Sequence, residues 1–73
     1  SEPSEVFSLF QHEGVEFIYI LKGEMVYRHG SRLYPMSEGD SLYFDADTPH
    51  GPEELGKLPI RFLSFIVEPQ SDS

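Results

Sequence analysis

Six glycines divide this 73-residue chain at nearly even intervals, and their spacing constrains the fold more than any other feature of the sequence. Between them lie short runs rich in β-branched and aromatic residues, which suit a pleated sheet. Several such runs separated by turn signals are typical of an all-β sandwich or barrel. No stretch carries a clean helical period of apolar residues, which also favours an all-β fold.

The sequence predicts one small domain over residues 1–73, with an ordered core at about 5–67 and flexible ends. The run "VEFIYI" is mostly apolar on both faces, so we expect its strand to be covered on both sides. A two-residue hairpin is expected at His29-Gly30, because glycine readily adopts positive φ, and His29 would be an exposed turn residue. The predicted strands are 5–12, 15–21, 24–29, 32–35, 41–45 and 60–67.

The composition excludes several classes of protein. There is no cysteine, which excludes disulfides and thiolate metal sites and agrees with a reducing cytoplasm. The longest apolar run, 17–21, is too short to cross a bilayer, and no basic segment before an apolar stretch predicts a secretory signal. We therefore expect a cytoplasmic protein without a membrane anchor.

The chain is strongly acidic, with 13 acids, five bases and a formal charge of −8. Such a surface repels the phosphate backbone, so direct contact with DNA or RNA is not expected from these residues. Four of the acids, 45, 47, 53 and 54, are read as a solvated loop.

The segment "QHEGVEF" places His12 and Glu16 four residues apart around Gly14. On a helix these two would be neighbours, but glycine costs about 1 kcal/mol there and the following residues prefer a strand. On a straight strand they would lie roughly 13 Å apart, too far to share an ion. A tight turn at residues 13–15 solves this, with His12 ending one strand and Glu16 beginning the next across an antiparallel pair.

A third donor is His50, in the segment "DTPHG" after the predicted strand 41–45, where we expect a turn. A barrel could fold that turn back towards His12 and Glu16. Two imidazoles and a carboxylate form the facial triad typical of non-haem Fe(II), and Mn, Ni or Zn would accept the same donors. The sequence thus predicts a divalent metal site, and the competing interpretation is that these side chains merely hydrogen-bond.

Aromatic residues near these segments are candidates to line a pocket, because sites for small molecules are largely apolar, although core packing is their commoner role. Arg61 shares a strand face with three apolar residues and could bind a carboxylate or phosphate. The ligand-binding candidates are Phe10, Tyr19, Tyr43 and Arg61.

Two motifs resemble those of the cupin family. "EFIYILKG", residues 16–23, is similar to the second half of the first cupin motif, H-x-H-x3–4-E-x6-G. "GDSLYFDADTPH", residues 39–50, is similar to the second motif, G-x5-P-x-G-x2-H-x3-N, up to its histidine. The resemblance covers about residues 10–51.

Three departures from the cupin pattern are visible. Phe10 replaces the first histidine, Asp45-Ala46-Asp47 replaces P-x-G, and Glu54 stands at the last position, which is often asparagine. Losing one histidine reduces the four ligands usual in the family to His12, Glu16 and His50.

The wider stretch "HEGVEFIYILKGEM…GDSLYFDADTPHG" is most similar to cupin sensor domains fused behind Cro/Xre-type helix-turn-helix domains in bacterial transcription regulators, and also resembles hydroxypropylphosphonic acid epoxidase. The resemblance implies a double-stranded β-helix (jelly-roll) barrel, for which this chain is short, and a homodimer. It implies a small-molecule effector and DNA contact only through a helix-turn-helix outside this chain.

Two other functions compete with sensing. One is a metal-dependent enzyme of the oxygenase, epoxidase or isomerase type, with Tyr19 or Tyr43 as proton donor. The other is a dimerisation module whose site is dead.

Overall fold

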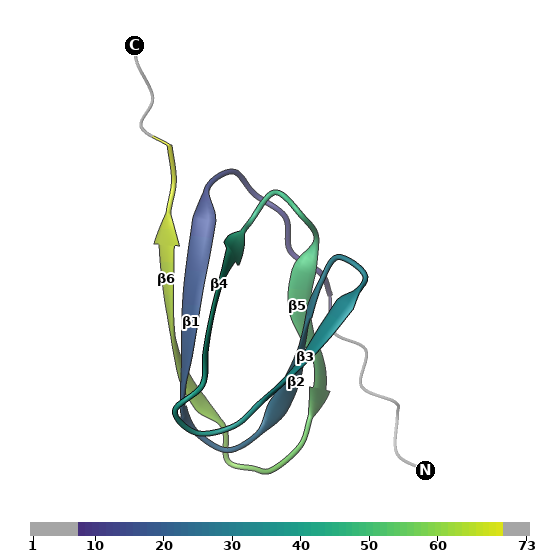
Figure 1. Cartoon of the computed structure of the whole chain (residues 1–73), viewed down its shortest axis with the longest axis vertical. Coiled ribbons are helices and arrows are strands. Elements are labelled where there is room, and N and C mark those ends of the chain that lie inside the picture. Colours follow the sequence, from purple (N-terminus) through teal and green to yellow (C-terminus); the bar gives the residue numbers. More distant parts are fainter. Residues whose placement is uncertain (1–7, 70–73) are drawn as a thin grey trace.

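The computed structural model describes residues 8–69, which form six strands and no helix, so the predicted all-β fold is confirmed. The strands make two three-stranded antiparallel sheets that face each other, ordered β4-β1-β6 and β3-β2-β5 (Figure 1). The same residues contain no helix that could cross a membrane. The strands are β1 (Val15–Lys22), β2 (Met25–His29), β3 (Arg32–Met36), β4 (Ser41–Asp45), β5 (His50–Leu55) and β6 (Arg61–Val67).

The core lies between the two sheets. Along β1 the side chains alternate, so Ile18 and Ile20 point inward and are fully buried. On the opposite face Tyr19 and Leu21 are exposed, and the expectation that this strand is covered on both sides is therefore wrong. The buried cluster consists of Ile18, Ile20, Met25, Tyr27, Met36 and Phe44.

The β2–β3 hairpin turns one residue later than predicted. His29 pairs with Arg32, so the two turn residues are Gly30 and Ser31, and Gly30 supplies the positive φ that a tight hairpin needs. His29 is accordingly the last residue of β2 rather than an exposed turn residue, and its side chain is mostly covered.

Strand β5 is the main element that the sequence did not predict. We expected His50 in a turn and Glu53 in a solvated loop, but both lie in a strand paired with β2. The segment "HGPEEL" has low β propensity. It pairs nonetheless because β5 is an edge strand with a register shift opposite Val26 and Tyr27, where a proline such as Pro52 is tolerated.

The predicted strand 5–12 is reduced to a single bridge in its described part. Phe10 pairs with His50 alone, and residues 5–7 lie outside the described residues, as do the ends 1–4 and 70–73 that we expected to be flexible. The chain runs beside β5, crosses to the other sheet at residues 13 and 14 and enters β1 (Figure 1). The expected reversal is therefore a crossover between sheets, not a hairpin within one.

Candidate metal centre

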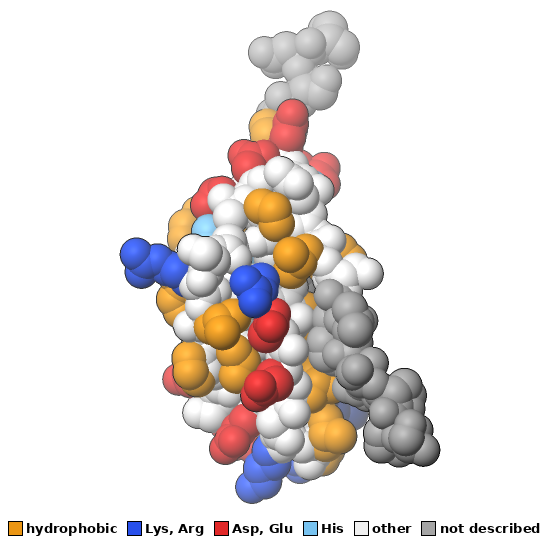
Figure 2. All heavy atoms as spheres, turned by 90° about the vertical axis from the view of Figure 1, so that its right-hand side faces the viewer, with side chains coloured by type: hydrophobic (Ala, Val, Ile, Leu, Met, Phe, Trp, Pro, Cys, Tyr) orange, Lys and Arg blue, Asp and Glu red, His pale blue; other side chains and the backbone are white. Residues whose placement is uncertain are grey.

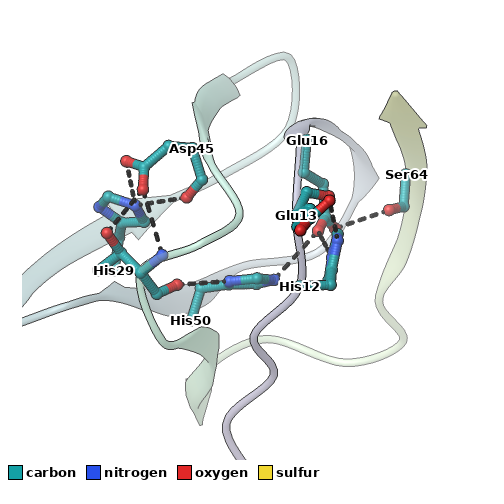
Figure 3. Close-up of polar contacts among 8 residues, drawn as sticks. His12, Glu13, Glu16, His29, Asp45, His50 and Ser64 are labelled. Carbon is teal, nitrogen blue, oxygen red and sulfur yellow. Dashed lines mark hydrogen bonds and ion pairs between the residues drawn. The ribbon is translucent and has the colours of Figure 1, made fainter. Parts of the chain in front are cut away.

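Three side chains from separate segments meet at one end of the space between the sheets. His12 comes from the crossover, Glu16 from the start of β1 and His50 from the start of β5. One donor atom from each lies within 4.8 Å of the others. The His50 Nε2–Glu16 Oε1 distance is 3.1 Å and the His12 Nε2–Glu16 Oε1 distance is 3.4 Å (Figure 3).

Gly14 makes this approach sterically feasible. Its φ of +107° lies in the region that L side chains rarely adopt. A Cβ at this position would also collide with the carbonyl oxygen of Val67 at the end of β6. Two backbone hydrogen bonds also tie the crossover to the turn that follows β4. The amide of Ala46 donates to the Gly14 carbonyl, and the amide of His12 donates to the Ala46 carbonyl. These bonds hold His12 next to the start of β1.

Backbone carbonyls orient both imidazoles in the same way. His50 Nδ1 lies 2.8 Å from the carbonyl oxygen of Thr48, and His12 Nδ1 lies 3.1 Å from that of Glu13. A carbonyl can only accept, so each neutral ring carries its proton on Nδ1. Each Nε2 then presents its lone pair towards Glu16, which is the arrangement that metal-binding histidines use.

Glu16 is buried, with 7% of its surface exposed. Its Oε2 accepts a hydrogen bond of 2.8 Å from the Ser64 hydroxyl on β6, while its Oε1 faces both histidines. Within residues 8–69 no lysine or arginine pairs with this carboxylate. A buried carboxylate requires compensating charge or donors, so the site favours a cation.

The two histidine–carboxylate pairs have the spacing of ligands to one divalent ion, and all three donor atoms lie within 4.8 Å of one another. Donors at about 2.1 Å from one ion, at angles between octahedral and tetrahedral, lie roughly 3.0 to 3.4 Å apart. Both nitrogen–oxygen distances, 3.1 and 3.4 Å, fall in that range. A two-histidine, one-carboxylate set leaves further coordination positions open for a ligand.

His12, Glu16 and His50 line a cavity of about 400 Å³ between the sheets. Besides the three candidate ligands, it is lined by residues from β2, β5, β6 and the segment before the crossover. They are Phe10, Tyr27, Pro52, Phe62, Ser64 and Ile66. Burial, reinforced by the negative charge of Glu16, raises the pKa of Tyr27, so its hydroxyl stays protonated in the cavity wall.

Comparison with known proteins places this architecture in a family. A model of the cupin domain matches residues 1–66. The chain belongs to the cupin family.

Two curated relatives of this cupin are notable. An oxalate-binding protein of Thermotoga maritima is 33% identical over 66 residues, covering 89% of this chain and 54% of the relative. An uncharacterized protein of Methanocaldococcus jannaschii is 30% identical over 56 residues, covering 77% of this chain and 45% of the relative. The chain thus spans about half the length of these relatives, and no solved structure matches it significantly.

The residues predicted from sequence fall into two groups in this cupin. His12, Glu16 and His50 come together, and Phe10 lines the cavity beside them. Tyr19 and Tyr43 lie on the other side of the β4-β1-β6 sheet and are 36% and 69% exposed. Arg61 is exposed on β6 and alternates with the residues of that strand that line the cavity.

Sequence reasoning missed Tyr27 and Ser64. A signal existed for Ser64, because it is the one hydroxyl within the apolar run "FLSFIV", where a polar side chain needs a partner. For Tyr27 the alternation along β2 indicated an inward position, opposite in face to Arg28, but not that the position lies beside the candidate ligands.

Proposed function

We propose that this cupin domain binds one divalent metal ion through His12, Glu16 and His50 and, in the adjoining cavity, a small organic ligand that completes the coordination. The observation that carries the proposal is the pair of Nδ1–carbonyl hydrogen bonds, because they aim both Nε2 lone pairs at a buried carboxylate. Iron, manganese, nickel or zinc suits these donors, and when bound the ion supplies a Lewis-acidic anchor for an oxygen atom of the ligand.

The cavity supports binding rather than proton-transfer catalysis. Of the described residues that line it, Tyr27 is the one titratable group apart from the three candidate ligands. Its raised pKa makes it a hydrogen-bond donor and a poor acid or base near neutral pH. The tyrosines suggested by the sequence as proton donors, Tyr19 and Tyr43, do not line this cavity.

Metal content after gel filtration tests the proposal. The purified chain is loaded separately with Mn²⁺, Fe²⁺, Ni²⁺ and Zn²⁺ and examined by elemental analysis. We expect one ion per chain for at least one metal, and its loss in His12→Ala and in His50→Ala. His29→Ala, which removes the third histidine of the chain, is the matched control and should keep the metal. Full metal content in both of the first two variants would refute the ligand set.

At the level of the cell, we propose that the domain is the sensing part of a cytoplasmic bacterial regulator, a homodimer whose DNA contacts come from a helix-turn-helix outside this chain. The motif resemblance supports this, as does the formal charge of −8, which disfavours DNA contact by the domain itself. A ligand regulates only if it binds two states of the protein with different affinity. DNA binding by the full-length gene product that does not respond to metal or ligand would count against the regulatory role.

A further inference from the structure

We propose that the ligand of this centre is a monoanion with an apolar body, such as an alkyl or aryl monocarboxylate, rather than a dianion. This inference rests on the proposed function, because the divalent ion supplies the positive charge of the site. It is carried by the charge balance of the centre and by the chemistry of the cavity walls.

The net charge of the metal-loaded centre is neutralised by one negative charge on the ligand. A divalent ion held by one carboxylate, Glu16, and two neutral imidazoles has a net charge of about +1, so one ligand carboxylate neutralises it. None of the described residues that line the cavity is a lysine or an arginine. A second carboxylate would therefore lie in the cavity without a counter-charge, which is unfavourable.

The surroundings of the cavity add to this selection. The chain carries a formal charge of −8, and the face shown in Figure 2 carries acidic side chains along its length with a few lysine or arginine side chains among them. Arg28, which follows the cavity-lining Tyr27 on β2, is bound to Glu53 at 2.7 Å and does not line the cavity. A dianion would meet a net negative field, and none of the described residues that line the cavity is a cation that offsets it.

The walls favour an apolar body. Phe10, Phe62 and Ile66 line the cavity and are nevertheless 56%, 42% and 51% exposed, so apolar surface beside the centre remains open to solvent. The Ser64 hydroxyl is already used, since it donates to Glu16. A ligand whose hydrocarbon part covers these walls gains the hydrophobic contribution of each methylene group.

The size of the cavity agrees with such a ligand. About 400 Å³ lies within the range of small-molecule pockets and exceeds the needs of an ion and a two-carbon acid. The printed name of the Thermotoga maritima relative assigns oxalate to that protein. An anion as small as oxalate would leave the walls of this cavity uncovered, so we infer that the two proteins differ in ligand.

Isothermal titration of the Mn²⁺-loaded chain with propionate, hexanoate and adipate tests the inference. Hexanoate and adipate have the same number of carbons and differ in the second carboxylate. We expect hexanoate to bind at least about tenfold more tightly than adipate. We also expect affinity to rise about fourfold for each methylene between propionate and hexanoate. Equal or tighter binding of adipate, or no dependence on chain length, would overturn the inference.

A substitution on β6 tests whether the cavity wall sets the preference for hexanoate over adipate. Ile66→Lys places a cation in the cavity wall and should shift the preference at least about tenfold towards adipate. Val67→Lys makes the same change at the next position, which is not in the cavity wall, and should leave the preference unchanged. An unchanged preference in Ile66→Lys would overturn the assignment of the apolar body to this cavity.

Metal content, measured first on each sample, separates the two proposals. A chain that holds the metal but does not prefer hexanoate refutes the ligand class and leaves the proposed metal site intact. An unsubstituted chain that holds no metal refutes both.

Discussion

Two histidine–carboxylate clusters lie next to the Phe44 ring, and only one is suited to a metal. The Phe44 ring centroid is 4.9 Å from that of His50 and 5.1 Å from that of His29. His50 belongs to the candidate centre with Glu16, whereas His29 pairs with Asp45 at 3.2 Å (Figure 3). The residue types and distances are nearly the same, so the difference in suitability for a metal has to come from other features.

The two clusters differ first in which imidazole nitrogen is hydrogen-bonded to a backbone carbonyl. His29 Nε2 lies 3.0 Å from the carbonyl oxygen of Asp45 and 3.2 Å from its carboxylate, so it must carry the proton and act as a donor. In the candidate centre the carbonyls bind Nδ1 instead, which leaves both Nε2 lone pairs available.

Burial makes the second difference. The Asp45 side chain is 53% exposed, and the hydroxyl and amide of Thr48 donate to its other oxygen at 2.7 and 3.2 Å. Solvent and the 45–48 turn therefore satisfy Asp45, whereas Glu16 is buried and has an oxygen directed at two lone pairs. A histidine and a carboxylate become a metal site when the carboxylate lacks other compensation, not when they are merely close.

The largest expected difference between the two clusters is the effect on metal affinity of replacing each carboxylate by an amide. Glu16→Gln removes the anionic ligand, and we expect metal affinity to fall by more than about 100-fold. Loss of a residue that only orients a metal ligand usually lowers the affinity by about 10- to 100-fold. Asp45→Asn is the matched control and should leave the affinity unchanged. Calorimetric titration with the metal measures the affinity of both variants. An equal loss of metal affinity in the two variants would show that the Glu16 cluster is no better suited to a metal than the Asp45 cluster.

Removing the hydroxyl that orients Glu16 should have a smaller effect. Ser64→Ala deletes the donor to Oε2, so the carboxylate is held less firmly and we expect metal affinity to fall about tenfold. Ser41→Ala, on the other edge strand of the same sheet, is the control. A Ser64→Ala variant that binds metal as well as the unsubstituted chain would show that this hydrogen bond does not support the site.

The smallest effect is expected at Asp45, and it concerns acid stability. The Thr48 hydroxyl, aided by the charge of His29, holds the pKa of this carboxyl below its ordinary value. A lowered folded-state pKa stabilises the protein above the unfolded value of about 3.9, and this contribution is lost as the pH falls through the folded value.

Thermal unfolding from pH 6 to pH 3 checks this expectation. The unsubstituted chain should be more stable than Asp45→Asn at pH 6, and the difference should shrink towards pH 3. A difference that grows on acidification would contradict the assigned direction of the pKa shift.

Much of the sheet structure could be predicted because the signals are local. Five of the six observed strands overlap predicted ones, since "VEFIYI" and "IRFLSFIV" favour a pleated backbone wherever they lie. Strand β5 could not be predicted, because Gly51, Pro52 and two glutamates weaken its propensity and only pairing with β2 makes it a strand.

The choice of inward-facing residues was harder. Alternation along β1 separates Glu16, Ile18 and Ile20 from Phe17 and Tyr19, but both sets are mostly apolar. Composition alone therefore could not say that Tyr19 faces outward. The same ambiguity applies to β6. The sequence suggested Arg61 as a ligand-binding residue, but Arg61 lies on the outer face of this strand, whereas Ser64 on the inner face contacts Glu16.

The sequence by itself determined the β-class, the cupin motif spacing and the three donor residues, because turns, alternation and donor chemistry depend on near neighbours along the chain. Only the tertiary structure decided that the crossover joins two sheets, that Tyr27 and Ser64 lie beside the candidate centre, and which ring nitrogens are free. Those features depend on where the carbonyls of Glu13 and Thr48 point once residues far apart in the sequence have packed together.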